Sequence, residues 1–240
     1  MLSWTVLQAL ADYRRRAHRV GAPLCARNRT EWMHVWCSKT MHRLNIQTQI
    51  LGNPPRTGLV VSNHLGYLDI IVLGSAIPCV FVSKMEVRQW PVFGGLTTKA
   101  GTVYVDRRRR SDTKNANEEI RLALYQGLPV VMFPEGTSSD GSEVMPFYPS
   151  LFEPAVESGA PMTATHLSYN LKKGDVGRDV AYWGNMIFFP HLLKLLSLES
   201  LIATVIFSEQ PKTFVNRKVA AAEMRNEVLT LAPNFVDTRD

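Results

Sequence analysis

The sequence predicts an α/β protein in which helices flank a mostly parallel, mixed β-sheet, preceded by a two-helix hairpin. From residue 45 onward, short β-rich runs alternate with helical stretches, which is typical of a parallel sheet covered on both faces. Runs such as 130–133 are continuously apolar, which indicates strands buried on both sides. We therefore expect a helical hairpin at residues 1–44 and one α/β domain at residues 45–240.

The hairpin combines aromatic and basic residues. Residues 2–19 carry apolar side chains at helical spacing, followed by arginines, and Gly21 and Pro23 interrupt the pattern. Thr30 can cap a second helix that contains two tryptophans. Two compatible readings follow: a hairpin packed on the main domain, or an anchor in the interface of a membrane.

The remaining elements are expected as follows. Helices should run from Ser111 or Asp112 to a stop before Gly127, and from Asn216 through Val228. Strands are expected at 46–50, 59–62, 80–83, 102–105, 130–133, 162–168, 180–183 and 203–208.

Composition narrows the class of protein. The 240 residues have a net charge of +6, which favours anionic partners such as phosphates or acidic lipids. Nucleic acid is a distant alternative, because no aromatic–basic recognition motif accompanies the arginines.

The three cysteines form neither a disulfide framework nor a metal motif, which suits a reducing compartment. No apolar run approaches the ~20 residues of a membrane-spanning helix, and the N-terminus lacks a signal-peptide pattern.

One strand end carries a histidine and an aspartate. His64 directly follows the apolar run at 59–62, and Asp69 comes five residues later. On a continuous helix the two side chains would lie about 140° apart and about 7.5 Å apart along the axis. If the helix starts after Gly66, Asp69 can reach the ring, fix its tautomer and leave the other nitrogen as a base. Spacing alone favours the plainer reading, a loop histidine beside a helix-capping aspartate.

Two further strands end in polar residues. Glu135, Gly136 and Thr137 follow the strand at 130–133, and Arg107 follows the strand at 102–105. The first group can bind an anion or form a tight turn, and Arg107 can hold a phosphate or pair with a carboxylate. Together with His64, these residues supply a base and an anion clamp. The sequence contains no G-x-S-x-G elbow, P-loop or H-E-x-x-H motif, so the substrate's own hydroxyl is the expected nucleophile.

These motifs resemble the glycerolipid acyltransferases of the 1-acyl-sn-glycerol-3-phosphate, or lysophosphatidic acid, acyltransferase (PlsC-like) type. N-H-L-G-Y-L-D at 63–69 is similar to their H-x4-D box, G-T-V-Y-V-D-R at 101–107 to the second box, and F-P-E-G-T-S at 133–138 to the third. The resemblance covers about residues 45 to 210. The fourth box departs from the family pattern, because it keeps Pro161 but has Ala164 at the second proline position, which puts donor choice in doubt. The stretch at 182–191 resembles bacterial members that act on less usual lyso-lipids, including ornithine lipids.

The resemblance implies an O-acyltransferase that moves a fatty acyl group from acyl-CoA or acyl carrier protein to the hydroxyl of a lyso-lipid such as 1-acylglycerol-3-phosphate. His64 would be the general base and Asp69 its partner, with no acyl-enzyme, metal or cofactor. The protein would sit on the cytoplasmic face of the cell membrane, peripheral or monotopic. The residues expected to bind substrate are Lys84, Arg107, Glu135, Gly136 and Thr137.

Three alternatives to this activity stay open. The acceptor could be a lyso-ornithine lipid or another lyso-lipid. Water could replace the acceptor, which would make the protein a thioesterase. The chain could also be a non-catalytic lipid-binding protein that keeps the fold, although the presence of both His64 and Asp69 argues against this reading.

Overall fold

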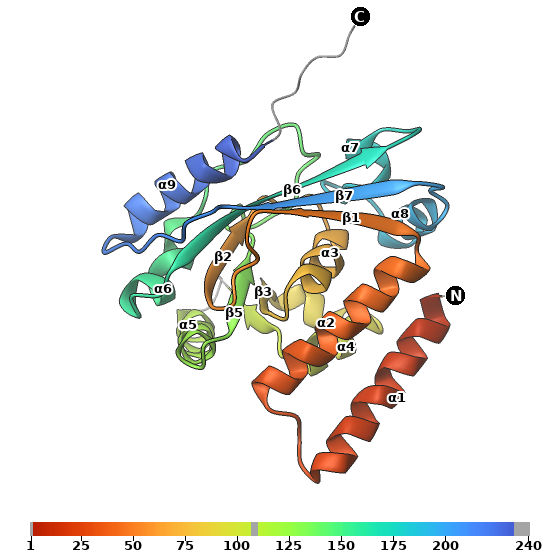
Figure 1. Cartoon of the computed structure of the whole chain (residues 1–240), viewed down its shortest axis with the longest axis horizontal. Helices are drawn as coiled ribbons and strands as arrows, with labels where there is room; N and C mark the ends of the chain where they lie inside the picture. The colour runs from red at the N-terminus through yellow and green to blue at the C-terminus, as the bar shows by residue number, and fades with distance from the viewer. Residues whose placement is uncertain (1, 107–109, 233–240) are drawn as a thin grey trace, which may run out of the picture.

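The computed structural model describes residues 2–106 and 110–232, and it confirms the predicted fold class (Figure 1). The sheet has the strand order β1-β7-β6-β2-β5-β3-β4. Neighbouring strands are parallel except for the antiparallel pair β6 and β7. The strands are β1 (Ile46–Leu51), β2 (Gly58–Ser62), β3 (Val80–Lys84), β4 (Val103–Val105), β5 (Pro129–Met132), β6 (Met162–Leu171) and β7 (Leu201–Phe207).

Helices cover both faces of the sheet. They are α1 (Leu2–Val20), α2 (Ala26–Arg43), α3 (Leu68–Ala76), α4 (Phe93–Ala100), α5 (Arg110–Tyr125), α6 (Glu153–Glu157), α7 (Val176–Asp179), α8 (Phe188–Leu196) and α9 (Arg217–Thr230), with 3-10 turns η1 (Met85–Gln89) and η2 (Pro149–Phe152).

Strand β2 lies in the interior of the sheet, and all of its residues are buried. Its side chains alternate between the two faces, as the pleat requires. Val60 packs in the core formed with α2, α3 and α4. Leu59 and Val61 pack in the core formed with α5, α6 and α9. The strand that carries His64 at its carboxyl end is therefore held from both sides.

Two local predictions were wrong. Residues 180–183 form a loop after α7 rather than a strand. The apolar run that suggested a strand is explained by the burial of Val180 and Ala181 in the core. Thr30 caps no helix, because α2 already begins at Ala26 after the N-cap residue Cys25. The Thr30 hydroxyl instead donates to the Arg27 carbonyl one turn earlier, at 2.8 Å.

The N-terminal hairpin packs on the rest of the protein through α2. Trp32 and Trp36 are buried, and their indole N–H groups donate to α1, to the Ala9 carbonyl at 3.2 Å and to the Asp12 carboxylate at 3.0 Å. These two tryptophans thus join the helices to each other, and Trp4 is the exposed tryptophan of the hairpin. Within the described residues, no helix is long and apolar enough to cross a bilayer.

Candidate active site

The chain leaves the sheet at a fixed point just before His64. Pairing between β2 and β6 ends at Ser62 and Thr165. Beyond it, the buried amide of Asn63 accepts from the Leu167 N–H and donates to the Leu167 carbonyl, both at 2.8 Å. The Asn63 side chain thus replaces the next pair of ladder hydrogen bonds, which satisfies buried backbone groups and sets where the turn begins.

The structure brings His64 and Asp69 together. Helix α3 begins only at Leu68, so residues 64–67 form a loop and the Asp69 side chain folds back over it. The distance from His64 Nδ1 to Asp69 Oδ2 is 2.8 Å. A carboxylate only accepts hydrogen bonds, so Nδ1 carries the proton and Nε2 is the ring nitrogen available to a ligand.

Four donors hold the buried Asp69 carboxylate. Besides the imidazole, Oδ2 accepts the N–H groups of Leu65 at 2.7 Å and Gly66 at 2.9 Å. Oδ1 accepts the Tyr169 hydroxyl at 2.7 Å. Because a buried carboxylate needs hydrogen-bond partners, the loop that presents His64 also satisfies the side chain that orients it.

Gly66 is required for close packing rather than for an unusual backbone angle. The Tyr182 N–H donates to the Leu65 carbonyl at 2.8 Å, which brings the 180–183 segment against the loop. A Cβ atom at Gly66 would lie 2.9 Å from the Tyr182 nitrogen. A larger residue would therefore push this segment away and disturb the loop.

The plane of the His64 ring is set by stacking. The ring lies on Phe133, with a centroid distance of 4.0 Å and an interplanar angle of 17°. Phe133 directly follows β5 and stacks in turn near Phe81 of β3. The imidazole is thus fixed by a hydrogen bond at one edge and an aromatic ring on one face.

Glu135, which the sequence predicts to bind substrate, has both of its carboxylate oxygens hydrogen-bonded to backbone N–H groups. Its side chain is buried. One carboxylate oxygen accepts the His64 backbone N–H at 2.9 Å, and the other accepts the Met145 N–H at 3.0 Å. Glu135 therefore ties the His64 loop to the loop around Met145.

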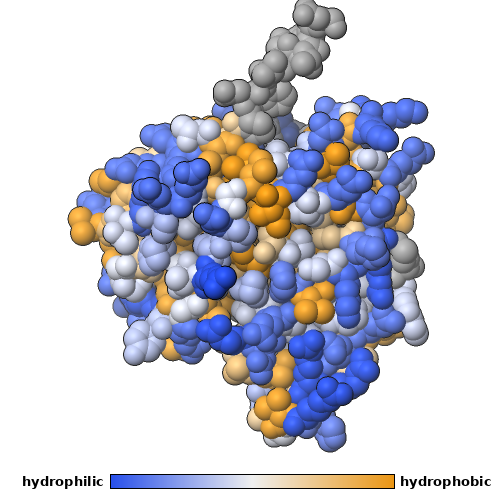
Figure 2. All heavy atoms as spheres, in the orientation of Figure 1, coloured by the Kyte–Doolittle hydropathy of each residue, from blue (hydrophilic) through white to orange (hydrophobic). Residues whose placement is uncertain are grey.

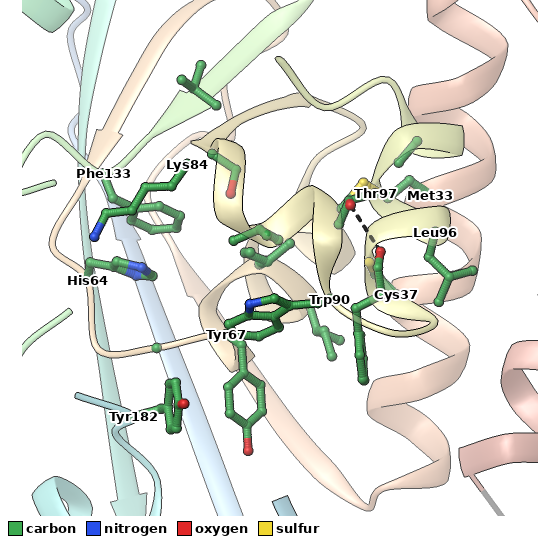
Figure 3. A pocket seen from close by; sticks show the side chains of 18 of the residues that line it. Met33, Cys37, His64, Tyr67, Lys84, Trp90, Leu96, Thr97, Phe133 and Tyr182 are labelled. Atoms are coloured by element: carbon green, nitrogen blue, oxygen red, sulfur yellow. Dashed lines mark hydrogen bonds between the residues drawn. The ribbon is translucent and has the colours of Figure 1, made fainter. Parts of the chain in front are cut away.

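The other predicted binding residues lie near His64, except for one outside the described residues. Gly136 and Thr137 line the same cavity as His64, and so does Lys84 at the end of β3. Figure 3 shows Lys84 extending toward His64 beside Phe133. Arg107 lies outside the described residues.

An apolar cavity of about 380 Å³ opens beside His64. This volume is within the range of small-molecule sites, about 300–1,000 Å³. Trp90 lies between the His64 end and the end lined by Met33, Cys37 and Leu96 (Figure 3). Helices α1, α2 and α4 thus supply a long apolar compartment next to the polar site.

Sequence reasoning missed three site residues. Phe133 was part of a recognised motif, but a stacking role has no local signal. Tyr169 lies 100 positions from Asp69, and Tyr182 belongs to a run that we interpreted as a strand. The pairing of β6 with β2 brings Tyr169 to the site, and the packing of the 180–183 loop brings Tyr182 there.

Comparison with known proteins gives a consistent result. A model of the acyltransferase family matches residues 44–168. The lyso-ornithine lipid O-acyltransferase of Brucella abortus is 36% identical over 189 residues, covering 72% of this chain and 70% of that protein. The lyso-ornithine lipid O-acyltransferase of Pseudomonas aeruginosa is 32% identical over 168 residues, covering 70% and 63%.

Two further similar proteins are named as 1-acyl-sn-glycerol-3-phosphate or 1-acyl-sn-glycerophosphate acyltransferases. The 1-acyl-sn-glycerol-3-phosphate acyltransferase of Neisseria gonorrhoeae is 34% identical over 138 residues, which is 54% of either protein. The match thus spans less than two thirds of the Pseudomonas and Neisseria relatives. The crystal structure of the 1-acyl-sn-glycerophosphate (LPA) acyltransferase PlsC from Thermotoga maritima superimposes with a TM-score of 0.60 at 20% identity, covering 84% of this chain and 80% of that one, which shows a common fold.

The position of Glu135 makes stability depend on pH. Burial raises the pKa of Glu135 to about 7, against the opposing effect of its hydrogen bonds to the Met145 and His64 N–H groups. The ordinary pKa of a glutamate carboxyl is 4.5, so between about pH 4.5 and pH 7 the folded protein binds a proton at Glu135 that the unfolded chain does not bind. This contribution to the free energy of unfolding therefore falls as pH rises through that window.

Replacing the carboxyl group tests this prediction. Glu135→Gln cannot titrate, so the free energy of unfolding of the wild type relative to this variant should decrease between about pH 5 and about pH 8. Urea unfolding at the two pH values measures the difference. The exposed Glu143 of the same loop provides the control Glu143→Gln. A difference independent of pH would contradict the assignment.

Proposed function

This chain belongs to the acyltransferase family, and we propose that it transfers a fatty acyl group from an acyl thioester to the hydroxyl of a lyso-lipid. The observation that supports this most directly is the His64–Asp69 pair beside an apolar cavity. The pair provides a base, and the cavity provides space for an apolar chain. Relatives named as lyso-lipid acyltransferases make the same reaction class the natural choice.

In this mechanism His64 acts as a general base. Its Nε2 removes the proton from the acceptor hydroxyl while the oxygen attacks the thioester carbonyl carbon. The tetrahedral intermediate then collapses, the carbon–sulfur bond breaks, and the leaving thiolate takes the proton back from the imidazolium. Asp69 stabilises the imidazolium between these steps. General-base catalysis supplies about 10²–10⁴-fold, so positioning and electrostatics supply the rest.

Direct transfer, without an acyl-enzyme, agrees with the residues around the cavity. Cys37 lines it, but burial raises the pKa of this thiol to about 12, and only the thiolate is a strong nucleophile. Ser138 also lines it, but its hydroxyl donates to the Tyr182 carbonyl at 2.5 Å. Neither Cys37 nor Ser138 is therefore a ready nucleophile, which supports attack by the acceptor hydroxyl.

The polar end of the cavity would hold the acceptor. Lys84 and Thr137 lie there, and we assign Arg107 to the same task from the sequence motif. Glu135 would act indirectly, by fixing the His64 backbone. A lyso-ornithine lipid and 1-acylglycerol-3-phosphate are the two candidate acceptors. The longer match to the lyso-ornithine lipid enzymes, 189 against 138 residues, favours the first.

The hairpin at residues 1–44 would bring the enzyme to the surface of a membrane. Trp4 and Leu7 of α1 are exposed, which suits the apolar side of an interfacial helix. Exposed arginines lie farther along α1, at Arg14, Arg15 and Arg19. In Figure 2 the lower lobe, where α1 and α2 join, carries strongly hydrophilic residues beside hydrophobic ones. These charges would contact acidic headgroups.

Removing the base tests the proposed reaction. His64→Ala should lower turnover by at least about 10²-fold while the circular dichroism spectrum stays unchanged. The assay pairs palmitoyl-CoA or palmitoyl carrier protein with each candidate acceptor. His42→Ala, at an exposed histidine of α2, is the matched control. Near-normal acyl transfer by His64→Ala would refute the mechanism, and fatty acid release without any acceptor would identify a thioesterase.

The cavity should select the acyl chain by length. Leu96 and Met33 line the end away from His64 (Figure 3), so Leu96→Trp should favour lauroyl-CoA over stearoyl-CoA and Met33→Ala should do the reverse. A competition assay with both donors measures the ratio. Leu122→Trp, on the exposed face of α5, should leave the ratio unchanged. An unaltered ratio in both cavity variants would exclude this cavity as the acyl site.

A further inference from the structure

Helix α8 presents an apolar stripe to solvent. Phe189 and Leu193 lie one helical turn apart and are 64% and 68% exposed, and Ile187 just before the helix is 72% exposed. The opposite side of the helix, with His191 and Leu195, is buried. A helix of a soluble domain normally turns its apolar side inward, but α8 is apolar on both sides.

The helix is firmly held against the active-site loop. The Tyr67 hydroxyl lies 2.8 Å from His191 Nδ1, and Tyr67 belongs to the loop between His64 and Asp69. Lys194 forms an ion pair with the buried carboxylate of Asp179 in α7. The exposed stripe is therefore a surface of defined shape rather than a frayed segment.

A second apolar element lies beside this stripe. Val92 is 58% exposed and has a φ angle of +67°, a conformation that β-branched residues rarely adopt. Residues 90, 91 and 93 around it form a shallow hollow together with Phe188 and Phe189 of α8. Such strain persists only where the surroundings impose it, and it often marks functional surfaces.

This surface also borders the apolar cavity beside His64. Phe188 of α8 and Trp90 and Phe93 of the turn line that cavity together with His64. The Phe188 ring lies 5.0 Å from Trp90 and 5.5 Å from Phe93, centroid to centroid. The exposed apolar stripe and the inner cavity are therefore continuous through one aromatic cluster.

The distribution of charge indicates what covers the surface. Neither residues 90–98 nor residues 180–193 contain an aspartate, glutamate, lysine or arginine. Arg88 and Lys99 flank the first stretch, whereas the second lies between Asp179 and Lys194, which form an ion pair with each other. An uncharged apolar patch with cations at its border complements a lipid leaflet with anionic headgroups.

We propose that α8 and the Val92 turn insert into the membrane leaflet, as a contact separate from the N-terminal hairpin. This inference rests on the proposed function, because it places the aromatic wall of the acyl cavity at the level of the lipid. A lyso-lipid would then reach His64 from the leaflet without exposing its chain to water. The patch, named here the α8 patch, consists of Val92, Ile187, Phe189 and Leu193.

Vesicle binding tests the α8 patch. Phe189→Ser/Leu193→Ser should weaken binding of the full chain to phosphatidylglycerol–phosphatidylethanolamine vesicles by at least about tenfold, since two large apolar side chains lose their burial. Leu122→Ser/Tyr125→Ser is the matched control. These residues of α5 are 55% and 90% exposed, and α5 packs on the opposite face of the sheet. Binding of the α8 variant at the wild-type level would refute the proposal.

A second measurement does not depend on a destabilising change. With Cys25, the exposed native cysteine, replaced by serine, an environment-sensitive fluorophore is attached to Phe189→Cys or to Tyr125→Cys. On addition of vesicles, emission should shift to the blue at position 189 only. No shift at position 189 would overturn the membrane assignment and leave the patch without a partner. A dimer of the free protein that protects this position would overturn it in favour of a second copy of the chain.

Turnover separates this inference from the proposed function. The double variant Phe189→Ser/Leu193→Ser should lose turnover with acceptor embedded in vesicles and keep it with a short-chain, water-soluble lyso-lipid. Equal loss with both acceptors would mean that α8 only supports the fold. If the wild type acylates neither acceptor, the proposed function fails. The vesicle-binding experiment would still show whether the α8 patch contacts the membrane.

Discussion

The arrangement of the site depends on one buried carboxylate. Asp69 accepts hydrogen bonds from the His64 ring, the Leu65 and Gly66 N–H groups and the Tyr169 hydroxyl. Three of these donors come from the loop after β2 and the fourth from the neighbouring strand β6, whereas Asp69 itself lies in the first turn of α3. A buried anion with fewer partners would be costly. The same interaction therefore shapes the loop and orients the base.

A second network supports the other side of the histidine. Glu135 holds the backbone N–H groups of His64 and Met145. Arg225 of α9 in turn donates to the carbonyl oxygens of Val144 and Met145. The C-terminal helix thus steadies a loop that steadies the catalytic turn, although α9 itself packs on the face of the sheet away from the cavity. A general base has to be held in position in this way, because a small displacement of the catalytic group lowers the reaction rate by a large factor.

Local patterns were sufficient to predict much of this architecture. The buried run of β2 and the five-residue spacing of His64 and Asp69 allowed one conditional statement: the pair forms only if no continuous helix joins them, and α3 indeed begins at Leu68. The partner Tyr169 could not be found, because the neighbour of β2 in the sheet is set by long-range pairing. Residues 180–183 were misread, since burial in a loop and burial in a strand produce the same apolar run. The inward position of Glu135 likewise depends on the distant Met145 loop.

The central claim is that Asp69 fixes His64 in the tautomer that leaves Nε2 free as a base. Heteronuclear NMR of the imidazole nitrogens measures this directly in the resting enzyme. In the neutral form of the ring, we expect His64 to carry its proton on Nδ1 rather than on Nε2, and Asp69→Asn should abolish this preference. A wild-type His64 protonated mainly on Nε2 would contradict the account.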